Sequence, residues 1–184
     1  MTDYPRWSYY PKNARPPRWA EQLVQATVAV QAEIHSVPLP LEDEDRRSDA
    51  VLARLRPDLE ALGYQVESGK TRANKITRPV LFGENGKPSV SYEIDAFHDS
   101  LKVAVEVEAG RGAANNADYR DILRTSLLLD ADYLALFMPI AYHYRSGGKS
   151  GVMHAYDGTH SQLDAIYASR RLQLPFEGVL LIGY

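Results

Sequence analysis

The sequence predicts an α/β (α+β) protein with one mixed β-sheet and helices on both of its faces. Short runs of β-branched and aromatic residues alternate with longer stretches in which apolar residues recur at helical spacing. Two of the apolar runs, 89–97 and 101–108, are separated only by His98-Asp99-Ser100. These two runs should form an antiparallel hairpin. A hairpin that is followed by a helix and a further strand gives a mixed sheet.

The length and composition of the chain fit one compact domain preceded by an arm. The chain has 184 residues, of which 45% are hydrophobic and 24% charged, as in ordinary globular proteins. The net charge of -3 argues against a general polyanion binder, although a local basic patch remains compatible with it. The absence of cysteine excludes disulfides, thiolate zinc sites and cysteine nucleophiles. Without a signal pattern or an apolar run of ~20 residues, we expect a cytoplasmic protein that does not enter a membrane.

Residues 1–19 are expected to form an extended arm, with a single domain over residues 20–184. Four prolines oppose regular structure in the arm: Pro5, Pro11, Pro16 and Pro17. Basic and aromatic residues alternate between them, and such residues could contact phosphates and bases. Packing of the aromatic rings on the domain is the favoured interpretation, because Tyr and Trp bury large areas wherever they can.

The first half of the domain should contain two helices and a short strand. Apolar residues recur at helical spacing over 19–35, and a second stripe of leucines over 48–62 ends at Gly63. Residues 64–67 have the composition of a short strand. The next segment, 69–79, contains no acid and should be a basic loop or hairpin. Its basic residues are Lys70, Arg72, Lys75 and Arg78.

The second half of the domain starts with a helix from Asn115 or Asn116 to about Asp130. Its buried face is predicted to consist of Tyr119, Ile122, Leu123 and Leu127. Four further segments complete the domain: an apolar strand over 131–142, a Gly-rich loop over 146–151, a helix over 161–171 and a final strand over 176–184.

Three acids lie within the predicted hairpin. Asp95 is near the end of the first strand, and Glu106 and Glu108 share one face of the second because side chains alternate. Carboxylates gathered without partners repel one another, and a bound divalent cation removes that conflict. We therefore expect a Mg²⁺ or Mn²⁺ site formed by Asp95, Glu106 and the Val107 carbonyl. The alternative is that these acids are simply the solvated half of alternating strands.

Such a site suits the hydrolysis of a phosphodiester bond, with Asp95, Glu106 and Glu108 as catalytic residues. A bound metal lowers the pKa of a water and neutralises charge in the transition state. A third acid at its edge can orient or deprotonate the water. An acid from the helix over 48–62 could complete the site, and Asp49 and Glu60 both lie off the leucine stripe.

Basic and amide side chains near the hairpin are candidates for nucleic-acid contacts. The candidates are Lys70, Arg72, Lys75, Arg111, Asn116 and Arg120. Phosphate contacts of this kind supply affinity and position rather than sequence choice. The alternative is a solvated basic loop in the first three cases and ordinary surface pairing in the others.

At its acidic residues the chain resembles the PD-(D/E)XK nuclease superfamily. The core of that superfamily runs helix, three-stranded meander, helix, strand, with an Asp and then Glu-x-Lys on the second and third strands. Asp95 and Glu106 match the two acids, and Glu108 stands where most members have Lys. The same departure is found in enzymes similar to BamHI, whereas enzymes similar to BglII have Gln. Residues 106–111, Asn116 and 119–121 are also similar to the BglII and BamHI-type branch, and the likeness covers about 85–184.

The resemblance implies a restriction-endonuclease-like core and a Mg²⁺-dependent endonuclease that cuts double-stranded DNA, similar to a type II restriction enzyme. It also implies a homodimer, because cutting both strands of a symmetric site takes two active sites. Without the usual Lys, the water would be positioned by Glu108 or by another group such as Lys70. The alternative is a catalytically weak nucleic-acid-binding or defence-associated protein on the same fold. A weaker option is a nuclease for RNA or branched DNA.

Overall fold

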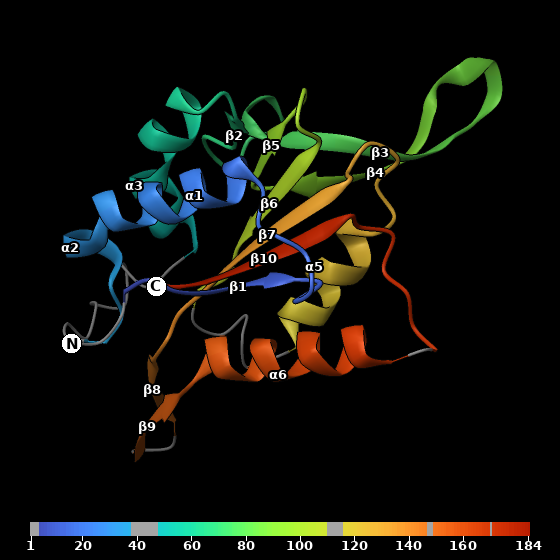
Figure 1. Cartoon of the computed structure of the whole chain (residues 1–184). Coiled ribbons are helices and arrows are strands. Elements are labelled where there is room, and N and C mark those ends of the chain that lie inside the picture. The colour runs from blue at the N-terminus through green and yellow to red at the C-terminus, as the bar shows by residue number, and fades with distance from the viewer. Residues whose placement is uncertain (1–3, 38–47, 110–115, 147–148, 170) are drawn as a thin grey trace.

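A mixed sheet of six strands forms the centre of the molecule (Figure 1). The computed structural model describes residues 4–37, 48–109, 116–146, 149–169 and 171–184. In spatial order the strands are β1 (Arg6–Tyr10), β10 (Gly178–Gly183), β7 (Tyr133–Met138), β6 (Val103–Val107), β5 (Ala96–His98) and β2 (Gln65–Val66). The neighbours β6, β7 and β10 are parallel, and the other pairs are antiparallel. The mixed sheet predicted from the sequence is thus confirmed.

Helices cover both faces of this sheet (Figure 1). On one side lie α1 (Arg18–Ala29), α2 (Gln31–Ile34) and α3 (Ser48–Ala61). On the other side lie α5 (Ala117–Thr125) and α6 (Ala155–Ala168). Each helical layer closes its own hydrophobic core against the sheet. None of the helices in the described ranges combines the length and the apolar character needed to cross a membrane.

The predicted arm contributes an edge strand to the sheet. Residues 6–10 form β1, which pairs with β10 from Arg6 opposite Gly183 to Tyr10 opposite Val179. Side chains alternate along a strand, so Tyr9 enters the core under α1 and Tyr10 enters the core under α6. The predicted packing of the aromatic rings is confirmed for Tyr9, Tyr10 and Trp19, whereas Trp7 is 40% exposed. The expectation that prolines keep the arm free of regular structure is wrong over these five residues, because Pro5 precedes the strand and Pro11 follows it.

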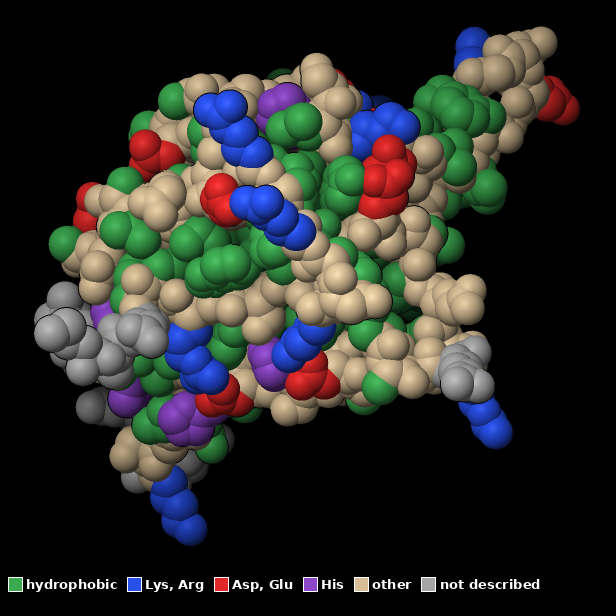
Figure 2. All heavy atoms as spheres, in the orientation of Figure 1, with side chains coloured by type: hydrophobic (Ala, Val, Ile, Leu, Met, Phe, Trp, Pro, Cys, Tyr) green, Lys and Arg blue, Asp and Glu red, His purple; other side chains and the backbone are tan. Residues whose placement is uncertain are grey.

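The predicted strand over 89–97 divides at Asp95. Residues up to Ile94 belong to β4 (Pro88–Ile94), which pairs only with β3 (Ile76–Phe82) in a separate two-stranded ribbon. Residues beyond Asp95 form β5, whose predicted pairing with the returning strand is confirmed by Ala96 opposite Val105. The ribbon projects from the body of the molecule, and Figure 2 shows hydrophobic side chains on it.

The helices before the ribbon lie where the sequence predicted them, but one predicted helix is divided in two. The predicted helix over 19–35 is divided into α1 and α2 at Val30. The predicted helix over 48–62 is α3, and Gly63 follows it with a left-handed φ of +95°. The short strand predicted over 64–67 is present as β2.

The segments after β7 differ more from the prediction. The strand over 131–142 is limited to Tyr133–Met138. The described residues of the Gly-rich segment belong to a second ribbon, formed by β8 (Tyr142–Ser146) and β9 (Lys149–Met153), while residues 147–148 lie outside the described ranges. Helix α6 begins at Ala155, six residues before the predicted start at Ser161. These differences share a cause, because pairing of β8 with β9 fixes where the chain enters the helix.

Helix α5 (Ala117–Thr125) does not bury the face that its sequence predicts to be buried. It ends at Thr125, and its predicted apolar face is mostly exposed: Tyr119 is 46%, Leu123 63% and Leu127 45% accessible. Of the four predicted residues only Ile122 is buried. Asn116 occupies the residue before the helix in a left-handed conformation and makes no capping hydrogen bond with its side chain, while Asn115 lies outside the described residues.

Candidate active site

Asp95 lies at the junction between the projecting ribbon and the central sheet. The Val107 amide donates a hydrogen bond to its Oδ2 atom at 2.7 Å. The Glu67 amide donates to its backbone carbonyl at 2.8 Å. These two contacts join β2, β5 and β6 at one point. The Asp95 carboxylate is therefore held against the end of β6 rather than exposed on the ribbon.

Glu106 and Glu108 lie at the end of β6, on the side of the sheet that faces α5. Val105 and Val107 alternate with them and enter the core under α1 and α3. The backbone around Glu108 is fixed by its amide, which donates to the Phe137 carbonyl at 2.9 Å. Its carbonyl accepts the Tyr184 hydroxyl at 2.8 Å. The two glutamates therefore project from a rigid strand end.

The three acids interact electrostatically. Burial raises the pKa of Asp95 to about 7, and the charge on Glu67 adds to the increase. Burial, with the charges of Asp95 and Asp121, raises the pKa of Glu106 well above its ordinary value. Burial and a hydrogen bond with Asp121 raise the pKa of Glu108 to about 8. A cation bound among these groups would oppose every one of these shifts.

The donors at this point suit a hard divalent cation. Mg²⁺ is commonly held by one or two carboxylates together with waters and substrate phosphate, and Asp95 with Glu106 supplies two. Within the described ranges, no group of three His, Asp or Glu residues is arranged so that it could hold a metal. Glu108 instead accepts a hydrogen bond from Arg120 at 2.8 Å. The predicted ligand role of the Val107 carbonyl stays a prediction.

Two site residues were not among the sequence-based candidates for catalysis. Glu67, at the end of β2, is only 7% exposed and contributes to the raised pKa of Asp95. The Lys75 ammonium lies 2.6 Å from Glu67 Oε1 and 3.6 Å from Glu93 Oε2. Lys75 appeared in the sequence only as a possible phosphate contact. The signal that could have revealed the pair is an acid at the end of the short strand predicted over 64–67, directly before a basic segment.

The acids and the lysine proposed to complete the site are exposed in the structure. Lys70 pairs with Asp49 at 3.1 Å, and both side chains are largely exposed. Glu60 is exposed on α3. The role of Lys70 in positioning the water stays a prediction, whereas Lys75 is an ammonium group paired with Glu67 and Glu93. The acid that joins the site comes from β2 rather than from α3.

The other predicted nucleic-acid contacts are distributed around the site. Arg72 is exposed in a short 3-10 turn (Arg72–Asn74) directly before Lys75, and Asn116 is exposed before α5. Arg111 lies outside the described residues. On the face seen in Figure 2, basic side chains lie beside acidic ones and form no continuous positive patch. A broad nonspecific polyanion surface is therefore not present on that face.

Two arginines of α5 connect that helix to the site. Arg120 bridges Glu108 and Asp121, with its Nε atom 3.1 Å from Asp121 Oδ1. Arg124 donates to the Glu93 carbonyl at 3.5 Å and lies over the ring of Tyr92. Both arginines therefore connect α5 to the acid-bearing segments, Arg120 near the middle of the helix and Arg124 in its last turn.

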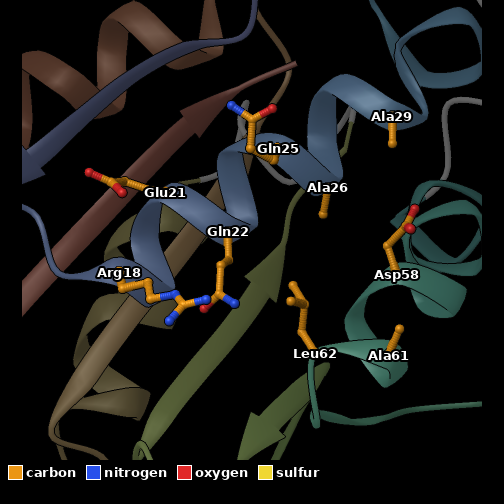
Figure 3. A pocket seen from close by; sticks show the side chains of 9 residues that line it. All are labelled: Arg18, Glu21, Gln22, Gln25, Ala26, Ala29, Asp58, Ala61 and Leu62. Carbon is orange, nitrogen blue, oxygen red and sulfur yellow. The ribbon is translucent and has the colours of Figure 1, made fainter.

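A groove of about 600 Å³ lies between α1 and α3, on the opposite face of the sheet (Figure 3). Its floor contains Ala26, Ala29, Ala61 and Leu62, and its rim is polar. None of the candidate catalytic residues lines it. The groove is therefore separate from the acidic site.

Comparison with known proteins identifies the fold. No protein-family model matches the chain, and no curated protein matches its sequence significantly. A solved structure, described as restriction endonuclease BglII complexed with a DNA 16-mer, matches with a TM-score of 0.54. The match has 11% sequence identity and covers 97% of this chain and 75% of that chain. The protein therefore has a restriction-endonuclease-like fold.

Proposed function

We propose that the protein is a Mg²⁺-dependent endonuclease that hydrolyses phosphodiester bonds of double-stranded DNA. The observation that carries the proposal is the gathering of Asp95, Glu106 and Glu108, each with a raised pKa, at the end of β6. Buried like charges of this kind are typical of functional sites. The fold supports the same conclusion, because the similar structure is that of an endonuclease bound to DNA.

In this proposal Asp95 and Glu106 hold the cation. Bound Mg²⁺ would act as a Lewis acid and lower the pKa of a water. Arg120 orients Glu108, and a carboxyl whose pKa is about 8 can accept a proton near neutral pH. Lys75 places a positive charge beside Glu67 and Asp95, where the Glu-x-Glu sequence lacks the usual lysine.

Incubation of the purified protein with supercoiled plasmid and Mg²⁺ tests the proposal. We expect nicked and linear products with Mg²⁺, none with EDTA, and at least a ~100-fold loss of rate for Glu106→Gln. The matched control is Glu33→Gln, which alters an exposed carboxylate on α2. If Glu106→Gln cuts as fast as the parent protein, the assignment is wrong.

A second candidate is a DNA-binding or defence-associated protein with little cleavage of its own. Glu108 favours it, because that side chain is already paired with Arg120 and Asp121 rather than free to act on water. Titration calorimetry distinguishes the two functions. A nuclease should bind Mg²⁺ or Mn²⁺ and lose that affinity in Asp95→Asn, whereas the absence of metal affinity with DNA present would support the second candidate. Cleavage of RNA or branched DNA instead of duplex would support a different nuclease class.

A further inference from the structure

The ribbon formed by β8 and β9 is basic and contains no acidic residue. Residues 142–154 include Arg145 and Lys149, together with His143 and His154, and neither Asp nor Glu. The chain as a whole has a net charge of -3, so this segment departs from the average. Lys149 is exposed and takes part in no ion pair between residues that the structure describes. The ribbon is therefore a local basic element on a mildly acidic protein.

The ring of Tyr144 lies across this ribbon on Gly151. The two residues are directly opposite each other in the antiparallel pairing of β8 with β9. A Cβ atom added to Gly151 would lie only 2.6 Å from Cζ of Tyr144, which is too close for two carbon atoms. Glycine within a strand commonly marks such a close approach. The absence of a side chain at Gly151 therefore lets the ring lie against the partner strand.

Much of the Tyr144 side chain is open to solvent. Tyr144 is 40% exposed, whereas Tyr10 in the core is inaccessible. Tyr142 lies two residues earlier on the same face of β8. The centroids of the two rings are 6.4 Å apart, and their planes differ by 21°. Tyr142 and Gly151 thus hold the Tyr144 ring in one orientation and leave much of it uncovered.

The ribbon starts at the edge of the sheet that carries the acidic site. Strands β6 and β7 are parallel neighbours, with Val107 opposite Phe137. Strand β7 ends at Met138, and β8 begins shortly afterwards at Tyr142. Figure 1 shows the ribbon projecting from this end of the sheet. Ligands of α/β sheets bind outside the carboxyl ends of parallel strands, so the acids and the ribbon belong to the same binding edge.

We propose that the β8–β9 ribbon is a second nucleic-acid contact, in which the Tyr144 ring stacks on an unpaired base and Lys149 pairs with a neighbouring phosphate. An exposed aromatic ring beside positive charge is the combination that binds single-stranded nucleic acid. The stacked base must lie outside a regular helix, because bases inside a duplex already stack on one another.

The occupant of the ribbon is inferred from charge and from position. The ribbon complements an anion, and it places that anion at the sheet edge that holds Glu106 and Glu108. The choice of nucleic acid rests on the proposed function, in which DNA binds at this edge. The inference goes further, since a protein that stacks an unpaired base favours substrates that contain one. The ribbon therefore assigns a substrate class: nucleic acid with a bulge, a mismatch or a single-stranded end.

Binding of a short duplex that contains one unpaired 2-aminopurine tests the inference. The measurement is made with EDTA, so that no metal-dependent cleavage takes place. The parent protein should bind this duplex at least ~5-fold more tightly than the fully paired one, the lower limit for stacking of one base on an aromatic side chain. The fluorescence of 2-aminopurine should decrease on binding, because stacking quenches it. Equal affinity for the two duplexes, or no binding to either, overturns the proposal.

Variants of the ribbon separate stacking from a merely structural role. Tyr144→Phe should keep the preference and the quenching, since stacking requires the ring and not the hydroxyl. Tyr144→Ala should lose both, and so should Gly151→Ala, because the added Cβ displaces the ring. The control is Val152→Ala, at the next position, whose side chain lies on the other face of the ribbon. If Tyr144→Ala kept the preference for the unpaired base, stacking on this ring would be excluded.

Lys149→Ala tests the phosphate contact. It should weaken binding to both duplexes and reduce the slope of log K against log salt by about 0.9. The control is Lys102→Ala, because Lys102 pairs with Asp132 before β6, at the end of that strand opposite the acids. An unchanged slope for Lys149→Ala would contradict the phosphate contact. Binding of poly-glutamate that depends on Lys149, without a preference for the unpaired base, would identify an acidic protein as the partner and overturn the proposal.

Failure of this inference and failure of the proposed function give different results. A protein that prefers the unpaired base through Tyr144 but never nicks plasmid with Mg²⁺ supports the ribbon contact and contradicts the nuclease. A protein that nicks plasmid but binds both duplexes equally supports the nuclease and contradicts the ribbon contact. If both are correct, Mg²⁺-dependent cleavage should be faster beside the unpaired base, and Tyr144→Ala should remove that difference.

Discussion

At the scale of single residues, burial favours the protonated form of the site acids, whereas metal binding requires their ionised form. Asp95, Glu106 and Glu108 all have a pKa above the ordinary value because burial disfavours their charged forms. Between the ordinary pKa and the raised one, the folded state binds more protons than the unfolded state. The contribution of these acids to stability is therefore fully present at low pH and is lost as pH rises.

The first prediction concerns stability without metal. The free energy of unfolding of the parent protein minus that of Glu106→Gln should fall as the pH rises from 4 to 8. The cause is that the parent must ionise a buried carboxyl, whereas the variant has no carboxyl at this position. Each such group contributes a slope of at most about 1.4 kcal/mol per pH unit. Urea denaturation with EDTA gives this difference, and added Mg²⁺ should stabilise the parent more at pH 8 than at pH 5. If the unfolding free energy of the parent minus that of Glu106→Gln increased with pH, the predicted direction would be contradicted.

A second prediction concerns the Lys75–Glu67 pair. Glu67 is nearly buried, so Lys75→Met leaves its charge beside Asp95 without a partner and should destabilise the fold by about 2–3 kcal/mol. Adding Glu67→Gln should recover much of that loss, which a double-mutant cycle measures as coupling. Lys70→Met is the control, because the exposed pair with Asp49 should contribute within about 0.5 kcal/mol. Additive effects of Lys75→Met and Glu67→Gln would show that the two residues do not interact.

At the scale of elements, the end of α3 depends on a glycine conformation. Gly63 has a φ of +95°, and a Cβ atom there would lie 3.0 Å from His98 Nε2 in β5. His98 is itself held edge-on against Tyr64, with ring centroids 5.0 Å apart. The left-handed turn thus directs the chain from α3 into β2, which brings Glu67 to Asp95.

A third prediction follows for this turn. Gly63→Ala should cost about 1–2 kcal/mol of unfolding free energy, since both the backbone conformation and the contact with His98 oppose a side chain. Gly86→Ala separates the two causes, because Gly86 has a φ of +68° with no atom within 4 Å of the added Cβ. Thermal unfolding should show the larger loss for Gly63→Ala. Equal losses would mean that His98 accommodates the methyl group.

Helices and strands that are marked by the spacing of their own apolar residues could be predicted from the sequence. The leucine stripe of α3 and the apolar strands β6, β7 and β10 agree with their predicted places. The pairing of β5 with β6 also followed from the short turn, and it placed Asp95 beside Glu106 and Glu108. Local signals gave no indication that β4 would leave the sheet at Asp95, because the run over 89–97 contains no glycine or proline to interrupt it.

The remaining errors involve partners that are distant in sequence. Glu67 reaches Asp95 only through the pairing of β2 with β5, which no local pattern reveals. Tyr119, Leu123 and Leu127 were predicted to be buried because amphipathicity identifies an apolar face but not the surface that covers it. The partners of Asp118 and Asp121 on the inward face explain the reversed orientation within one subunit.

At the scale of the whole molecule, the net charge of -3 means that the DNA binding of the proposed function would have to come from a restricted basic surface. Most basic side chains near the site already have acidic partners, including Lys75, Arg78 and Arg120. Arg72, exposed before Lys75, and Lys70, in an exposed pair with Asp49, have more freedom to meet phosphate.

The fourth prediction concerns the salt dependence of DNA binding. Arg72→Ala should lower the affinity for every duplex by a similar factor and reduce the slope of log K against log salt by about 0.9 if one phosphate contact is lost. Fluorescence anisotropy over a range of salt concentrations measures the slope. Lys102→Ala is the control, because Lys102 lies before β6, at the end of that strand opposite the acids, and pairs with Asp132. Identical slopes for all three proteins would exclude Arg72 from the DNA contact.

The pairing of β1 with β10 also sets an order of events during synthesis. Residues 6–10 are synthesised long before their strand partner β10, at residues 178–183. At the usual rate of translation, Tyr9 and Tyr10 wait roughly 10–30 s before that partner exists. During this interval the nascent chain carries two large unburied aromatic rings, a feature that chaperones bind. Closure of the sheet edge by β1 is thus among the last steps of folding, and its long sequence separation favours a slow one.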